Sequence, residues 1–254
     1  VIPEKIGSYT VNTIEYGAFK DNNKITSVKI PSTVTQIGNS YGSGAFENCA
    51  NLKSVSIAAG AETAYIGDAA FKDCTSLEEI TVPGNYTTIY SDAFRGCRSL
   101  KKFVYNDNGI SRKIQNRAFY ECTSLVSLSL PTSLNSIGDE AFSGCSSLTA
   151  VDIPEGVKLI EYGVFNNCKL LKKVVIPSTI QRIGNSYNTG AFQNCTSLST
   201  VTIKEGSQAA TIGSNTFSGC SAITSIVIPG NYSNVMDSAF NCLLYTSPSP
   251  RLRR

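Results

Sequence analysis

The sequence contains no histidine and no tryptophan, one methionine and only 16% charged residues. Histidine is the side chain that most often acts as a general base or a zinc ligand. Its absence excludes Ser–His and Cys–His nucleophile pairs and most zinc sites. No apolar run approaches the roughly 18 residues that a membrane-spanning helix needs. The sequence therefore favours neither catalysis nor membrane insertion.

What is present suffices for a folded core. The chain has 254 residues, of which 41% are hydrophobic, enough for one large domain or two ordinary ones. Nine cysteines could indicate a disulfide framework. Their spacing argues otherwise, because eight of them follow a repeated phenylalanine at a fixed offset.

A repeat of 23–27 residues dominates the sequence. Its anchor is a phenylalanine, found at Phe19, Phe46, Phe71, Phe94, Phe119, Phe142, Phe165, Phe192, Phe217 and Phe240. Alanine precedes the anchor in eight units. Cysteine follows three residues later at Cys49, Cys74, Cys97, Cys122, Cys145, Cys168, Cys195 and Cys220. Such a period is the signature of a repeat architecture.

Three apolar positions follow each cysteine, as in Leu52, Val55 and Ile57, and proline often ends the segment. The alternation of the last two predicts a strand with one buried face. A unit this short cannot bury its apolar side alone, whereas stacked units share one core. We therefore expect a parallel sheet with strands about 4.8 Å apart and a ladder of phenylalanines inside.

Length differences between units indicate loops and a duplication. Two of the longest units carry the related inserts Gly38–Gly44 and Gly184–Gly190. The surrounding segments Ile30–Cys49 and Ile176–Cys195 are nearly the same and lie 146 residues apart, which indicates a duplicated block of several repeats. Below, the copies are called the first block and the second block.

The cysteines are expected to be buried free thiols. Equivalent side chains in neighbouring coils should lie near 4.8 Å apart, which suits the geometry of a disulfide poorly. A small apolar filler in the core is the simplest role for such a thiol. A metal ladder would need converging ligands, and no cysteine stands out as reactive.

The pattern L-x-x-V-x-I-P, with I-G-x-x-A-F-x-x-C, resembles the BspA-like leucine-rich repeats of bacterial and protozoan surface proteins. The resemblance covers residues 1–241. It implies a repeat solenoid: a leucine-rich-repeat horseshoe with a parallel β-sheet on one face and short turns, 3-10 helices or short strands on the other. It also implies a cell-surface or secreted adhesin.

Residues 242–254 do not continue the repeat. Cys242 misses the register, and the segment Cys242–Arg251 resembles a translated sequencing-library adapter. We expect a repeat array over 1–241, truncated at both ends, and a non-native tail over 242–254. No signal peptide is visible. Without the tail, 19 basic residues balance 19 acidic ones, so net charge gives no case for binding nucleic acid or an anionic membrane.

Partner binding is predicted on the outward positions of the repeated strands. These are Ser54, Ser56, Glu79, Thr81, Lys102, Ser127, Ser129, Asp152, Lys173, Thr200 and Thr202. An extended, preformed surface suits a protein partner, which the resemblance places on host or neighbouring cells. The alternative is a solvated sheet face without a binding role. Tyr41 and Tyr187, in the two inserts, are rival contact points, because tyrosine is common at interfaces.

Three functional classes follow. The first is a non-catalytic protein-binding module, with no cofactor and no metal. The second is an accessory targeting domain of a larger secreted enzyme, which flanking coding sequence would reveal. Intrinsic enzymatic activity is the least favoured, because there is no histidine and neighbouring carboxylates such as Glu78 and Glu79 alternate in direction.

Overall fold

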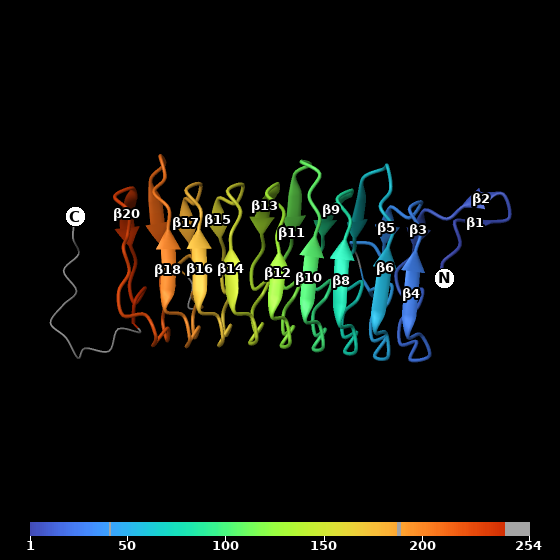
Figure 1. Cartoon of the computed structure of the whole chain (residues 1–254), viewed down its shortest axis with the longest axis horizontal. Coiled ribbons are helices and arrows are strands. Elements are labelled where there is room, and N and C mark those ends of the chain that lie inside the picture. The colour runs from blue at the N-terminus through green and yellow to red at the C-terminus, as the bar shows by residue number, and fades with distance from the viewer. Residues whose placement is uncertain (41, 187–188, 242–254) are drawn as a thin grey trace.

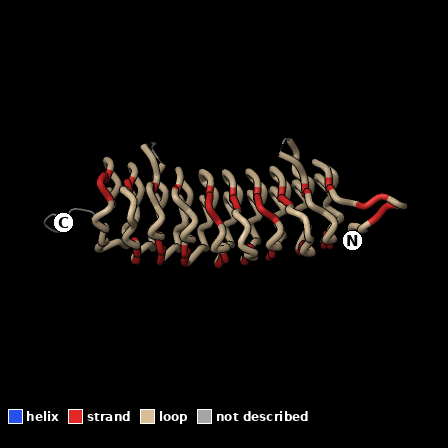
Figure 2. Tube along the Cα trace, turned by 90° about the horizontal axis from the view of Figure 1, so that it is seen from above, coloured by secondary structure: helices blue, strands red, loops and turns tan. Residues whose placement is uncertain are grey.

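The chain forms an elongated rod of about ten stacked coils (Figure 1). This computed structural model describes residues 1–40, 42–186 and 189–241. Most coils contribute one strand to a front sheet and one to a back sheet, and seen from above these strands form two rows along the rod (Figure 2). None of the described residues is helical. The tail predicted for 242–254 lies outside the described residues.

The front sheet is parallel, as predicted. Its strands are β4 (Ser27–Ile30), β6 (Ser54–Ile57), β8 (Glu79–Val82), β10 (Lys102–Tyr105) and β12 (Ser127–Ser129), followed by β14 (Ala150–Asp152), β16 (Lys173–Ile176) and β18 (Thr200–Ile203). The hydrogen-bonded ladder pauses between β12 and β14. The register pairs like with like: Val28 lies beside Val55, and Val174 beside Val201. Alternate side chains therefore enter the core, which is why the valine and isoleucine positions repeat.

The back sheet is also parallel. Its strands are β3 (Thr13–Ile14), β5 (Gln36–Ile37), β7 (Ala64–Ile66), β9 (Tyr86–Ile89), β11 (Arg112–Ile114) and β13 (Leu134–Ile137), then β15 (Leu159–Ile160), β17 (Arg182–Ile183), β19 (Ala210–Ile212) and β20 (Tyr232–Val235). Its hydrogen-bonded ladder pauses between β13 and β15. Each ends at or near the isoleucine that precedes the anchor, as in the pairing of Ile37 with Ile66. Short turns, 3-10 helices or short strands were expected opposite the main sheet. The described residues there form short strands and turns.

The phenylalanines form the predicted ladder. From Phe19 to Phe240, consecutive rings stack with centroids 4.9–5.5 Å apart and planes within 12° of each other. The backbone reinforces the stack: the Phe46 amide donates to the Ala70 carbonyl at 2.7 Å, and every anchor from Phe19 to Phe217 makes the equivalent bond. This third ladder of hydrogen bonds continues from Phe119 to Ala141 and from Phe142 to Val164, where the front and back sheets are interrupted.

The eight described cysteines are buried and free, as predicted. The structure adds a role that the sequence did not show. Each thiol donates to the carbonyl of the anchor phenylalanine in the preceding coil, with S···O distances of 3.0–3.3 Å. Burial raises the pKa of these thiols, for example Cys97 and Cys145. They are therefore protonated donors inside the core.

The turns around each anchor need a left-handed backbone. The second residue after the phenylalanine has a positive φ, 58° at Asn48 and 60° at Asn194. Asparagine, aspartate and glycine tolerate this conformation best, and they occupy the position in nearly every unit, with Glu121 as an exception.

Two local features depart from the repeat. At the start of the chain, β1 (Lys5–Ile6) and β2 (Tyr9–Thr10) pair antiparallel as an exposed hairpin. In the middle, Arg112 is completely buried. Its guanidinium forms an ion pair with Asp107 at 3.0 Å and donates to the Ile110 carbonyl at 2.6 Å, so it fixes the loop after β10.

Candidate interaction surface

All eleven residues predicted to bind a partner are exposed on the outer face of the front sheet. We call this the strand face: the outward side chains of β4 to β18 and the residue before each strand. The register aligns them in two rows. One row contains Ser54, Glu79, Lys102 and Ser127, then Lys173 and Thr200. The other contains Ser56, Thr81 and Ser129, then Asp152 and Thr202. The structure therefore brings the predicted residues onto one continuous surface.

Lysines give the strand face its charge. It carries six of them, Lys29, Lys53, Lys101, Lys102, Lys172 and Lys173, against the three carboxylates Glu78, Glu79 and Asp152. Lys101 and Glu78 form an ion pair at 3.2 Å, with both side chains more than half exposed. Within the described part of the chain, the other five lysines have no carboxylate within 4.0 Å. Their ammonium groups face solvent and are available to a partner.

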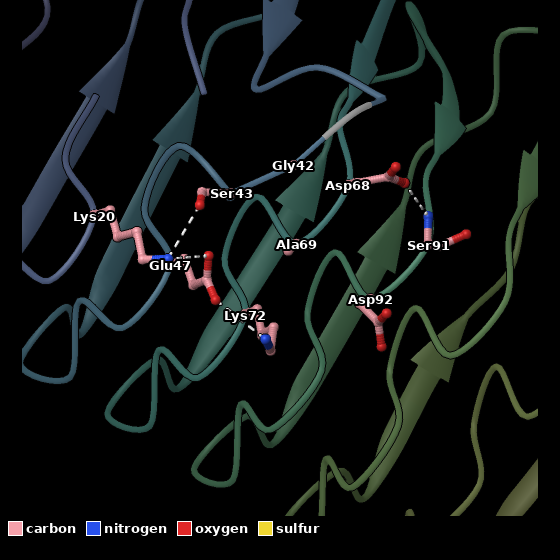
Figure 3. Close-up of a pocket in the computed structure, with 9 residues that line it drawn as sticks. All are labelled: Lys20, Gly42, Ser43, Glu47, Asp68, Ala69, Lys72, Ser91 and Asp92. Carbon is pink, nitrogen blue, oxygen red and sulfur yellow. Dashed lines mark hydrogen bonds and ion pairs between the residues drawn. The ribbon is translucent and has the colours of Figure 1, made fainter. Parts of the chain in front are cut away.

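A second feature, missed in the sequence, lies on the turn flank, which we define as the residues from three before to two after each anchor phenylalanine. A polar hollow of about 330 Å³ lies there, and Figure 3 shows the residues that line it. It is lined by Lys20, Gly42, Ser43, Glu47, Asp68, Ala69, Lys72, Ser91 and Asp92. These residues come from four successive coils, so the hollow exists only in the stacked array.

Glu47 is the centre of this hollow. Its side chain is only 10% exposed, and its two oxygens each lie 3.1 Å from a lysine ammonium, of Lys20 and of Lys72. One oxygen also accepts the Gly44 amide at 3.2 Å. Burial raises the pKa of Glu47, but the hydrogen bonds from Lys72, Lys20 and the Gly44 amide, with the charge of Lys72, together lower it by more, so the pKa lies below its usual 4.5. Glu47 is therefore a buried anion that its neighbours neutralise.

The opposite wall of the hollow carries Asp68 and Asp92. Asp68 accepts the Ser91 amide at 3.0 Å, and Asp92 lies 3.5 Å from Arg95. Burial raises the pKa of Asp68, and repulsion from Asp92 raises it further. The Asp68–Ser91 bond links neighbouring coils, whereas the Asp92–Arg95 ion pair lies within one coil, so both charges have a structural role.

The equivalent position of the second block is uncharged. Lys20, Glu47, Asp68, Lys72 and Asp92 correspond, 146 residues on, to Asn166, Gln193, Ser214, Ser218 and Ser238. Gln193 still accepts the Gly190 amide at 3.2 Å. The sequence held a signal for this difference: the residue after the anchor is charged in the first four units, from Lys20 to Arg95, and neutral from Tyr120 onward.

The described residues offer little for chemistry. They include no group of three histidine, cysteine, aspartate or glutamate side chains that could hold a metal ion. Over the same residues, no helix could span a lipid bilayer. The rival contact points Tyr41 and Tyr187 lie outside the described residues.

The stacked coils with a phenylalanine ladder and a polar strand face agree with the family comparison. The model of the BspA type leucine rich repeat region matches residues 5–112 and 112–245. The chain belongs to this family. BspA type repeats are generally non-catalytic scaffolds, and leucine-rich repeats generally mediate protein binding.

Several solved structures are similar. A leucine-rich cell surface protein from Faecalibacterium prausnitzii A2-165 is 27% identical, with a TM-score of 0.47, over 94% of this chain and 77% of that one. The leucine-rich repeat protein of T. pallidum is 22% identical, with a TM-score of 0.47, over 88% and 77%. A leucine-rich repeat protein from Bacteroides ovatus ATCC 8483 is 23% identical, with a TM-score of 0.41, over 94% and 84%. No curated protein sequence matches the chain.

Proposed function

We propose that this BspA type array is a non-catalytic protein-binding module of a cell-surface or secreted adhesin. Its strand face would dock a protein on host or neighbouring cells. The observation that carries the proposal is the pair of aligned rows of exposed serine, threonine, lysine and carboxylate side chains on consecutive strands. The stacked core holds these side chains in place before any partner arrives, which lowers the entropy cost of docking.

The test is binding of residues 1–241 to a panel of purified matrix and cell-surface proteins, measured by biolayer interferometry. We expect at least one partner, and we expect Ser56→Tyr combined with Ser129→Tyr to weaken its binding at least tenfold, because two bulky rings would stand in the docking surface. Both serines are exposed on the front sheet.

The matched control combines Ser136→Tyr with Ser233→Tyr, which places the same rings on exposed positions of the back sheet. We expect this control to bind as the unmodified chain does. A panel without any partner, or a partner equally sensitive to both pairs of substitutions, would contradict the proposal.

A further inference from the structure

Charge is unevenly divided between two surfaces of the rod. The strand face holds six lysines and three carboxylates, whereas the turn flank holds nine carboxylates and the four cations Lys20, Lys72, Arg95 and Arg117. Over residues 1–241 the two signs cancel. A chain without net charge thus has a basic strand face and an acidic turn flank. Such separation directs an approaching charged partner to one surface.

The basic charge of the strand face is concentrated in two pairs. Lys101 and Lys102 lie at the start of β10, and Lys172 and Lys173 lie at the start of β16. Lys102 aligns with Ser127, and Lys173 aligns with Ala150. Three coil steps therefore separate the pairs, about 14 Å at the usual strand spacing. The strands between them carry mainly small side chains, so the surface is open there.

The remaining charges on this face indicate what kind of partner fits. Glu78 and Glu79 lie directly beside Lys101 and Lys102, and Asp152 lies one strand from Lys173. A uniform polyanion such as a nucleic acid or polyphosphate would meet these carboxylates with charge of the same sign. A protein can place its carboxylates opposite the lysine pairs and leave neutral or basic groups opposite Glu79.

We infer that the partner is a protein that presents an acidic surface to the strand face, with carboxylates opposite the two lysine pairs. This inference rests on the proposed function and specifies its partner. Complementary charge on exposed side chains chiefly accelerates association and sets specificity. Because exposed charges are screened by salt, binding should weaken as ionic strength rises.

The test uses a fluorescein-labelled peptide with the sequence Glu-Glu-Ser-Gly-Glu-Glu, in which about 3.3 Å per extended residue places the centres of the two acidic pairs about 13 Å apart, close to the spacing of the lysine pairs. Fluorescence anisotropy measures its affinity for residues 1–241 at 50 and 300 mM salt. We expect binding that weakens at least tenfold at the higher salt. Lys102→Gln combined with Lys173→Gln should weaken it at least fivefold at the lower salt.

The matched control is Lys113→Gln combined with Lys158→Gln, two exposed lysines at the back sheet whose removal changes net charge equally. We expect it to retain peptide binding. No binding at 50 mM salt, equal weakening by both pairs of substitutions, or tighter binding of polyphosphate than of the peptide would each overturn the inference.

The same variants separate this inference from the proposed function. Suppose that Ser56→Tyr with Ser129→Tyr weakens binding of a panel protein, whereas salt and the lysine substitutions do not. The strand face is then the docking surface, and the inference of an acidic partner is wrong. If no panel protein binds while the peptide does, the charge inference holds for peptides and the proposed docking of surface proteins fails.

Discussion

The first and second blocks have the same backbone arrangement but differ in charge on the turn flank. In the first, the Gly44 amide is capped by the buried carboxylate of Glu47, which two lysines neutralise. In the second, the Gly190 amide is capped by the neutral amide of Gln193 at the same 3.2 Å. The fold therefore requires a hydrogen-bond acceptor at this position and does not require a charge. The lysines of the first block compensate for the carboxylate.

The largest expected effect would show that the two blocks share one core. Phe46→Ala and Phe192→Ala should each lower the free energy of unfolding by about 3–5 kcal/mol, because both rings are fully buried and stack on two neighbours. Urea unfolding of residues 1–241 with reductant present measures both. If one variant lost less than about half the unfolding free energy that the other loses, the two blocks would be packed differently.

An intermediate effect is expected from placing the charge of the first block into the second. Gln193→Glu would create a partly buried carboxylate with no lysine beside it, since Asn166 and Ser218 stand where Lys20 and Lys72 do. We expect a loss of about 1–2 kcal/mol at pH 7.

The pH dependence of the stability loss in Gln193→Glu tests whether the buried charge causes it. Desolvation would raise the folded-state pKa of the new carboxyl above its unfolded value, so the loss should be full above the folded pKa and disappear as pH falls below the unfolded value. Urea unfolding at pH 7 and at about pH 3.5 checks this. Adding Asn166→Lys to Gln193→Glu should recover part of the lost stability. If it recovers none, the lack of a lysine beside the new carboxylate does not explain the loss.

The smallest effect is the reverse exchange. Glu47→Gln should keep the cap on Gly44 and lose both ion pairs, at a cost of about 1 kcal/mol at pH 7. Because the pKa of Glu47 is lowered in the folded state, its contribution is present above the unfolded value and is lost as pH falls through the folded one. The difference in melting temperature between the variant and the unmodified chain should therefore shrink as pH falls below 4.5 and be smallest at the most acidic pH, measured by thermal melts across pH. A difference that does not shrink would point to packing instead of charge.

Much of the fold could be predicted from the sequence because one set of offsets recurs. The spacing of Phe71, Phe94 and Phe119 predicted a ladder, and the alternation around Val55 and Ile57 predicted which side chains face outward. The resemblance left open what lies opposite the front sheet. The short strands there depend on pairing between coils, which no single unit reveals.

Other features can be recognised only in the folded structure, once the coils are stacked. Arginine side chains are usually exposed. The sequence therefore gives no indication that Arg112 is buried. The hollow around Glu47 combines residues from four coils, so it is visible only once their register is known. The placement of the strand-face residues was predictable, whereas their role in binding stays a prediction.

The thiol-to-carbonyl bonds inside the rod have a consequence for how the protein responds to its chemical surroundings. While the coils remain wound, the eight cysteine thiols of the described residues are hydrogen-bonded and buried, which protects them from oxidants and alkylating reagents. When neighbouring coils separate, several sulfhydryls are released at once. In an oxidising medium they would cross-link and trap the opened chain. Winding therefore protects these eight thiols from oxidation, and in an oxidising medium unwinding is reversible only where a reductant keeps them reduced.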